Sequence, residues 1–190
     1  MKKLFFSAIS NTVVLLAFTA VNAGAADHSY VGTKDCKKCH IKQWKSWSET
    51  KMANALDTLK PGVVADRKAE LGLDPAKDYT VDENCVKCHV TGFGAEGGFV
   101  SEAETPELVG VGCEMCHGPG GTYTQDGYMT LKNKEYRKAD LVAVGLVDTV
   151  SEAQCMVCHN EDVPIEGYTF DFETKKAEGT HESYELKYAH

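Results

Sequence analysis

Apolar side chains recur at helical spacing in the segment that begins at residue 41. This segment has no glycine or proline before residue 61, and its large apolar residues include Trp44, Trp47, Met52, Leu56 and Leu59. The pattern predicts a helix from residue 41 that ends near residue 60. A second, shorter helix is predicted for residues 63–71, because a glycine and a proline follow it closely.

The rest of the chain is broken into short pieces. Residues 91–99 contain four glycines and predict a loop or a short hairpin, and the Gly118-Pro119-Gly120 run ends any helix before it. Residues 139–147 fit no single pattern. Residues 168–172 alternate like a brief strand, and residues 181–188 predict one or two helical turns. The expected fold is therefore mainly α, with short helices and long loops.

The N-terminus has the pattern of a secretory signal. Two lysines follow Met1, residues 4–20 are largely apolar without charge, and small residues follow up to Ala26. The sequence predicts a signal peptide over residues 1–26, cut after residue 23, 25 or 26, and one domain over residues 27–190. An uncleaved membrane anchor is the alternative, but the apolar run is short and interrupted by polar residues.

One pentapeptide pattern, C-x-x-C-H, occurs four times and uses all eight cysteines. It is the attachment sequence for c-type haem, in which two thiols bond the porphyrin and the histidine becomes the proximal iron ligand. Zinc sites, a redox dithiol and disulfides would not explain a histidine after every second cysteine. The four predicted sites are Cys36, Cys39 and His40; Cys85, Cys88 and His89; Cys113, Cys116 and His117; and Cys155, Cys158 and His159.

Chain length constrains how four haems are packed. Cleavage after Ala26 leaves 164 residues, or about 41 for each haem. A chain of this length cannot build a conventional side-chain core in addition to four haems. We therefore expect the haems to form the core and to lie close together. The glycines of residues 91–99 would then let the backbone approach a haem face.

The mature chain is acidic. Loss of Lys2 and Lys3 with the signal leaves 18 basic and 28 acidic residues, a net charge of −10. This charge excludes nucleic acid and anionic membrane surfaces as natural partners and favours a redox protein with a basic docking patch. The alternative is that the acidity only keeps a small protein soluble.

Histidines are too few to give every iron two of them. Seven are present and four are proximal ligands, which leaves His28, His181 and His190. Methionine is the other common axial ligand and raises the reduction potential. Met52 and Met129 are the candidates, although methionine also fills gaps in cores. His28 is an alternative cap for a haem, and His190 is expected to be frayed at the chain end.

The sequence resembles the tetrahaem cytochrome c-554 family of ammonia-oxidising bacteria along nearly the whole mature chain. The matching segments are Gln43-x-x-Ser46-Trp47-x-x-Thr50, Leu73-Asp-Pro-Ala-Lys-Asp-Tyr-Thr80, Cys88-His-Val-x-Gly-Phe-Gly94, Gly110-Val-Gly-Cys-Glu-x-Cys-His-Gly-Pro-Gly120 and Tyr168-Thr-Phe170. The resemblance implies a mostly helical fold, haems in stacked pairs, and hydroxylamine oxidoreductase as the electron donor. The acidity departs from the basic charge expected of that family.

The resemblance also implies distal ligands. His181 matches the distal histidine of the fourth haem, Met52 replaces that of the third, and Met129 lies near the position that serves the first. The second haem, on His89, has no distal protein ligand in the family. Its open iron is expected to be five-coordinate and accessible to a small gaseous ligand.

The expected function is a periplasmic electron carrier between redox proteins. One alternative is an enzyme that reduces nitric oxide or a similar small molecule at the open His89 haem. Another is a unit of a haem-to-haem filament, for which the sequence shows no polymerising surface.

Overall fold

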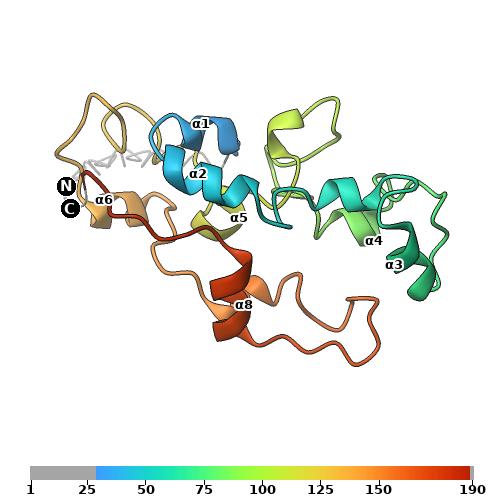
Figure 1. The fold of residues 1–190 in the computed structure, drawn as a ribbon. Coiled ribbons are helices and arrows are strands. Elements are labelled where there is room, and N and C mark those ends of the chain that lie inside the picture. The colour runs from blue at the N-terminus through green and yellow to red at the C-terminus, as the bar shows by residue number, and fades with distance from the viewer. Residues whose placement is uncertain (1–28, 189–190) are drawn as a thin grey trace, which may run out of the picture.

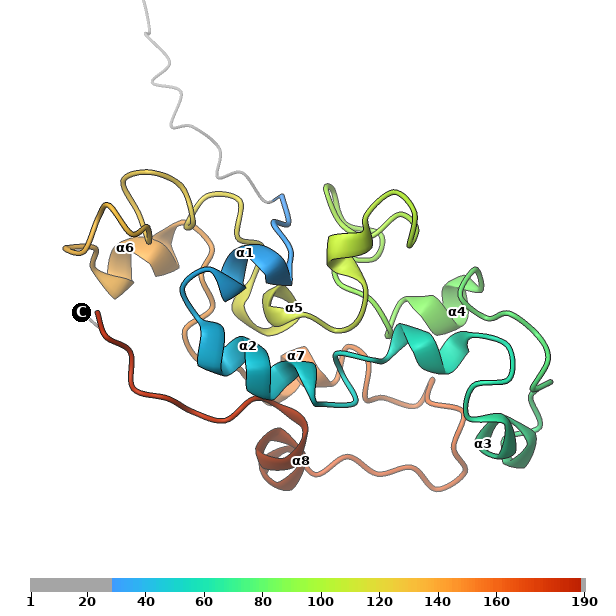
Figure 2. The same ribbon diagram turned by 45° about the horizontal axis from the view of Figure 1, so that its top comes forward.

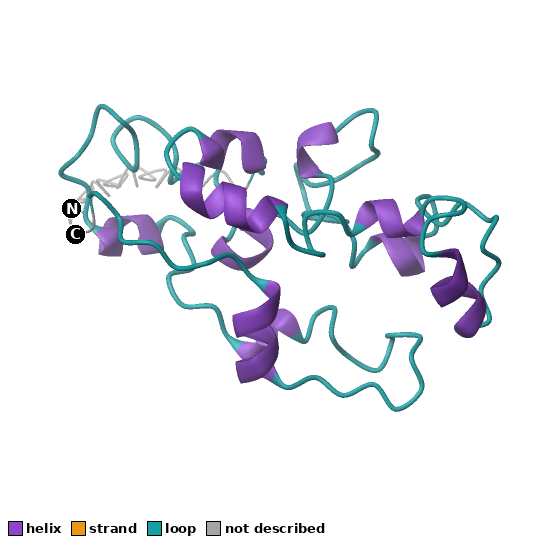
Figure 3. Cartoon of the chain, in the orientation of Figure 1, coloured by secondary structure: helices purple, strands orange, loops and turns teal. Residues whose placement is uncertain are grey.

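The computed structural model describes residues 29–188, so the predicted signal peptide, His28 and His190 lie outside the described residues. Figures 1 and 2 show short helices joined by long loops, and Figure 3 shows no strand in the described chain. A single antiparallel bridge, Val90 with Val109, is the β pairing recorded within residues 29–188. This confirms the prediction of a mainly α fold.

Ten short helices and 3-10 turns make up the regular structure of residues 29–188. Their bounds are α1 Thr33–Lys37, α2 Ile41–Ser48, η1 Leu56–Leu59, α3 Ala65–Glu70, α4 Glu83–Val86, η2 Pro106–Leu108, α5 Cys113–His117, α6 Lys138–Ala143, α7 Glu152–Cys155 and α8 Phe172–Gly179. The elements spread from α6 through α1, α2 and α5 to α4 and α3, and α8 lies beside this row (Figure 1). Within residues 29–188, no helix is long and apolar enough to cross a membrane.

The helix predicted from residue 41 to about residue 60 is wrong in its length. It ends at Ser48 and is followed by turns and then η1. The Asn54 side chain donates to the carbonyls of Ser48 and Thr50, and the Thr50 hydroxyl donates to the Trp47 carbonyl. These polar side chains bond the carbonyls that a continuing helix would use, so the helix stops although the apolar spacing continues.

Other predicted elements had mixed outcomes. A helix does lie within residues 63–71, as α3, and the ambiguous region after residue 138 begins as α6. The strand predicted over residues 168–172 is wrong: the Asp171 carboxylate accepts from the Thr174 amide and starts α8 at Phe172. The helical turns predicted for residues 181–188 are also absent, and the Glu182 amide there donates to the Ser46 hydroxyl.

The side-chain core is small. One cluster of buried residues lies around η1 and α4 and comprises Leu56, Leu59, Tyr79, Val86, Val90, Phe99 and Leu108. Only Tyr123 and Leu141 add to the buried hydrophobic residues elsewhere within residues 29–188. This agrees with the prediction that the chain has no conventional core apart from its cofactors.

Candidate haem-attachment sites

Each C-x-x-C-H motif is wound as a helical turn. α1 and α7 reach the first and fourth motifs, α4 reaches the second, and α5 is the third motif itself. The amides of His40 and His159 donate to the carbonyl of the first cysteine in their motifs, at 2.9 Å in both cases. Residues three and four positions apart share one face of a helix, so this winding presents two thiols and an imidazole together. A porphyrin attached to both thiols would therefore lie beside the histidine.

The third motif ends where the sequence predicts. Gly118 follows α5 with a φ of 79°, a left-handed conformation that favours glycine. A Cβ atom built there would lie 2.4 Å from the Gly145 carbonyl oxygen. The glycine therefore stops the helix and lets residue 145 pass close to the motif.

Hydrogen bonds fix the orientation of three imidazoles. Nδ1 of His89 lies 2.7 Å from the Ala55 carbonyl oxygen, Nδ1 of His117 lies 3.2 Å from the Val147 carbonyl oxygen, and Nδ1 of His181 lies 2.8 Å from the Glu182 carbonyl oxygen. A carbonyl only accepts, so each Nδ1 must carry the proton. Nε2 then keeps its lone pair for a metal, which is the arrangement that metal-binding histidines use.

In the fourth motif, a side-chain hydroxyl instead of a carbonyl orients the imidazole. Nδ1 of His159 lies 2.5 Å from the Tyr168 hydroxyl, and the Phe170 ring stacks on the imidazole with ring centroids 4.5 Å apart. Burial lowers the pKa of His159, and it also lowers the pKa values of His40 and His117. Burial therefore favours the neutral form of these three rings, which is the form that binds a metal.

The thiols of different motifs approach one another in pairs. Cys36 and Cys113 share a hydrogen bond, which raises the pKa of Cys36 and lowers that of Cys113. Burial, with Cys155 nearby, raises the pKa of Cys116 to about 11. Burial, with Cys88 beside it, raises the pKa of Cys158 to about 12. The attachment points thus follow the spatial order first, third, fourth and second motif.

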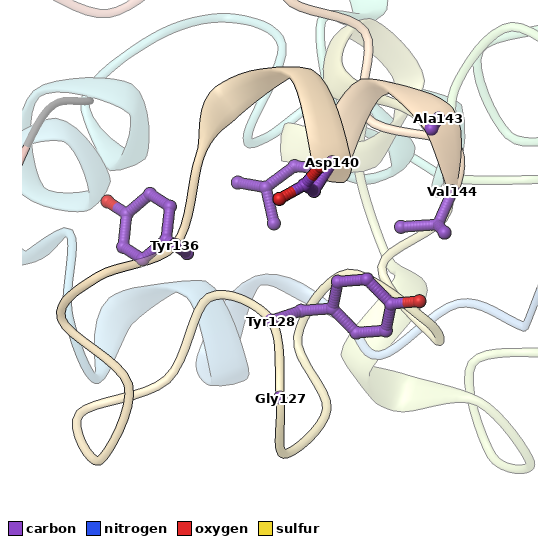
Figure 4. A pocket seen from close by; sticks show the side chains of 7 residues that line it. Gly127, Tyr128, Tyr136, Asp140, Ala143 and Val144 are labelled. Carbon is purple, nitrogen blue, oxygen red and sulfur yellow. The ribbon is translucent and has the colours of Figure 1, made fainter.

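Two cavities lie beside the motifs. One of about 230 Å³ is lined by Cys88 and Cys158 and by Gly92, Phe93 and Ala95 of the glycine-rich loop. Another, of about 510 Å³, is lined by residues that include Tyr128, Tyr136 and Asp140 (Figure 4). Burial, and then the Cys39 thiol of the first motif, raise the pKa of Tyr136. The donor set of two thiols and one imidazole at each motif fits c-type haem.

The glycine-rich loop approaches a protein side chain closely. A Cβ atom built on Gly92 would lie 2.6 Å from the Tyr30 ring, and the Gly92 amide donates to the Met115 sulfur at 3.2 Å. Glycine at this position therefore allows contact with Tyr30. The packing of this loop on a haem face stays a prediction.

The indole N–H of Trp44 gives a separate indication of a bound acid. Its nitrogen is buried and has no hydrogen-bond partner within residues 29–188. Trp44 lies in α2, directly after the first motif, and the Lys37 ammonium lies 3.7 Å from its ring centroid. A buried donor normally has an acceptor, and a haem propionate would supply one.

The candidate distal ligands lie near the motifs. Met52 is tied to the third motif, because its carbonyl accepts from the Val111 amide at 2.9 Å. Met129 belongs to the loop whose Tyr123 lies near Cys36 and Cys113, and its amide donates to the Tyr123 carbonyl at 3.0 Å. The His181 ring lies beside that of His117, with centroids 6.2 Å apart. The resemblance instead implied that His181 serves the haem on His159.

Glu114 is a site residue that the sequence reasoning missed. Its side chain is 3% exposed and lies inside the third motif. Its carboxylate accepts from the amides of Val31, Gly32 and Gly120, at 2.9, 2.8 and 2.7 Å. It therefore joins the start of the described chain to the loop after the third motif. The sequence shows an acidic residue between the two cysteines, but no residue pattern indicates its backbone partners.

Four thiol pairs, each followed directly by a histidine, define a tetrahaem c-type cytochrome. A family model described as "Cytochrome c554 and c-prime" matches residues 35–118. Cytochrome c-554 of Nitrosomonas europaea is 39% identical over 197 aligned residues, which cover 91% of this chain and 83% of that protein. The chain therefore belongs to the cytochrome c-554 family of electron-transfer cytochromes, and its cofactors are haems.

The fold agrees with that assignment. The solved structure of reduced cytochrome c554 from Nitrosomonas europaea matches with a TM-score of 0.72 and 36% sequence identity. The match covers 87% of this chain and 91% of that one. The fold is therefore that of a multihaem cytochrome.

Proposed function

We propose that this protein is a periplasmic electron carrier that passes electrons between two redox proteins along the order of its four motifs. Each haem, when bound, exchanges single electrons at its iron. The observation that carries the proposal is the contact between successive motifs: α1 packs on α5, the Gln154 side chain before the fourth motif donates to the Cys116 carbonyl at 3.0 Å, and Lys87 of the second motif pairs with Asp162 at 2.9 Å. These contacts place the first, third, fourth and second motifs next to one another in that order.

The chain's own residues set the properties of the carrier. His40, His89, His117 and His159 are proposed as proximal ligands, and carbonyls or a hydroxyl hold the last three of these rings. His181, Met52 and Met129 are the proposed distal ligands, with His181 and Met52 as the two candidates for the haem on His117. The protein sets the axial ligands of each haem, the spacing between the haems and their burial. These properties determine the order of the reduction potentials along the path.

The surface charge favours a basic partner at the fourth motif. Residues 148–174, which contain this motif, carry seven acidic side chains and no basic one. Opposite charges speed association and orient the partners. The proposed partners therefore include a redox protein with a basic docking patch. A hydroxylamine-oxidoreductase-like donor, which the family resemblance implies, is also part of the proposal.

Electron exchange with a basic partner should slow as salt is added. The test mixes the reduced protein with a basic monohaem cytochrome c and follows its reduction by stopped flow. The rate constant should fall steadily as ionic strength rises, because the Debye length shrinks to about 8 Å at physiological salt. A rate that is flat or rises with salt would remove electrostatic docking from the proposal, and no transfer at all would remove the carrier function.

A second candidate function is reduction of a small molecule at the haem on His89. Gly92, Phe93 and Ala95 line the same cavity as Cys88, so the glycine-rich loop faces this motif. Access through such a loop would decide whether a ligand enters.

The haem on His89 should be five-coordinate and high-spin when oxidised. His181, Met52 and Met129 are proposed as ligands of other irons, which leaves this iron without a distal protein ligand. Nitric oxide should bind the reduced protein, and cyanide should bind the oxidised protein poorly. Electron paramagnetic resonance during a redox titration measures the spin state. Wholly low-spin spectra would exclude the open site, whereas rapid turnover of nitric oxide would favour the enzyme.

A further inference from the structure

The charge of this acidic chain is reversed around the first motif. Residues 33–48, which form α1, the first motif and α2, contain five lysines and one acidic residue. All five side chains are exposed. We call this surface the α1–α2 lysine face, and it comprises Lys34, Lys37, Lys38, Lys42 and Lys45.

The charges of the lysine face are mostly not neutralised. Lys38 pairs with Asp35 at 2.7 Å, and it is the one member with an ion pair among the described residues. Lys37 lies over the Trp44 ring and Lys42 lies over the Tyr184 ring, contacts that leave the positive charge in place. The face therefore presents at least four lysine charges to solvent.

The lysine face surrounds the attachment point that is nearest to solvent. Cys39 is exposed, whereas the other seven cysteines are partly buried. α1 and α2 lie side by side in both orientations of the ribbon, with Cys39 in the connection between them (Figures 1 and 2). An electron exchanged with a partner docked on this face would enter or leave at the first haem.

The first motif and the fourth motif, which is third in the spatial order, have surroundings of opposite charge. The first motif begins the order and is basic, whereas the fourth motif, near the other end, lies in residues 148–174 with seven acidic side chains and no basic one. Such an asymmetry orients the molecule in the field of a charged partner before contact. The partner suited to the fourth motif is basic, so the partner suited to the first must differ from it.

We propose that the α1–α2 lysine face is a docking surface for an acidic redox protein, which exchanges electrons with the first haem. This inference rests on the proposed carrier function and adds a second, oppositely charged partner to it. In the exchange one partner loses one electron and the first haem iron gains it, or the reverse, and no atom is transferred. Exposed lysines would pair with carboxylates on the partner surface and fix its position over Cys39.

The test is a charge reversal on the holoprotein. Lys34→Glu with Lys45→Glu removes two lysines of the face that form no ion pair among the described residues. Lys175→Glu with Lys176→Glu on α8 is the control, because it changes the net charge equally at another place. The donor is a flavodoxin hydroquinone, a small acidic redox protein, and reduction of the haems is followed by stopped flow at low ionic strength.

The lysine-face variant should lose about tenfold or more in rate with flavodoxin, because steering by opposite charge raises association rates by about 10–1,000-fold. The α8 variant should stay within about twofold of the unaltered protein. Equal slowing of both variants would show an effect of net charge alone and would overturn the proposal. An unchanged rate for the lysine-face variant would overturn it as well.

Two further measurements separate this inference from the alternatives. The neutral lumiflavin semiquinone, generated by flash photolysis at neutral pH, should reduce all three proteins at the same rate, since it has no charge to steer. Failure of the unaltered protein to accept electrons from lumiflavin would refute the carrier function itself. Sedimentation with phosphatidylglycerol vesicles should show no binding, and binding that depends on Lys34 and Lys45 would reassign the face to a membrane surface.

Discussion

Replacement of Glu114 by alanine is expected to destabilise the folded protein by about 3–5 kcal/mol. The carboxylate accepts from three backbone amides, of Val31, Gly32 and Gly120, and the side chain is 3% exposed. Each buried amide that loses its acceptor costs about 1–3 kcal/mol. The expected loss for three amides lies near the lower end of the sum, because water can enter and hydrate some of them. The measurement is urea unfolding of the holoprotein followed by far-ultraviolet circular dichroism.

Two variants make this prediction specific. Glu114→Gln keeps one carbonyl oxygen, so it should lose less stability than Glu114→Ala. Glu152→Ala removes an exposed acid from the first turn of α7, three residues before Cys155, and should change stability by less than about 0.5 kcal/mol. If Glu114→Ala unfolds at the same urea concentration as Glu152→Ala, the three hydrogen bonds do not stabilise the fold.

Replacement of His181 by alanine is expected to change the third haem and to leave the fourth unchanged. The ring centroids of His117 and His181 lie 6.2 Å apart, close to the separation of about 6 Å for two imidazoles that bind one metal from opposite sides at about 2 Å each. Both rings donate Nδ1–H to a carbonyl and leave Nε2 free. The geometry therefore favours His181 as the distal ligand of the haem on His117.

Met52 is close enough to take the place of His181. Its terminal methyl carbon lies 3.5 Å from a Cβ built on Gly179, two residues before His181, and its backbone is bonded to Val111 before the third motif. In His181→Ala the thioether should therefore bind the third iron, keep it low-spin and raise its potential. The weak long-wavelength charge-transfer band from sulfur to iron should grow.

The opposite assignment gives a different spectrum. If His181 serves the fourth haem, as the family resemblance implies, His181→Ala should produce a high-spin haem and leave the charge-transfer band unchanged. Met52→Ala is the matched variant: it should leave that band unaltered if His181 holds the third iron, and should weaken it if Met52 does. The two variants together decide between the assignments.

The sequence predicted the class of protein, a multihaem cytochrome of the c-554 family, because the attachment chemistry is local and its pattern is readable in the chain; the individual attachment residues stay a prediction. A thiol, two intervening residues, a thiol and an imidazole act within one helical turn, so the pentapeptide alone specifies them. Distal ligands are less predictable, because they come from distant segments. His181 lies 64 positions after His117 in the chain and yet beside it in space.

Helix lengths were less predictable for a physical reason. The apolar spacing through Leu59 predicted one continuous helix, but the side chains of Thr50 and Asn54 bond backbone carbonyls and end it at Ser48. Similarly, Asp171 caps α8 at the place where alternation predicted a strand. In a chain with few buried apolar residues, such local polar bonds outweigh periodicity. Glu114 was missed because its three partners are backbone amides, which no residue pattern reveals.

The scarcity of buried hydrophobic side chains bears on how the protein is made. Only nine hydrophobic residues are buried within residues 29–188. Before the porphyrins are attached, the polypeptide has too little apolar surface to offset the conformational entropy of ordering its loops. A newly made chain would thus stay open, with every cysteine pair accessible to the enzyme that joins it to haem. Maturation and folding then become one event, and a chain that misses a porphyrin remains a substrate for proteolysis.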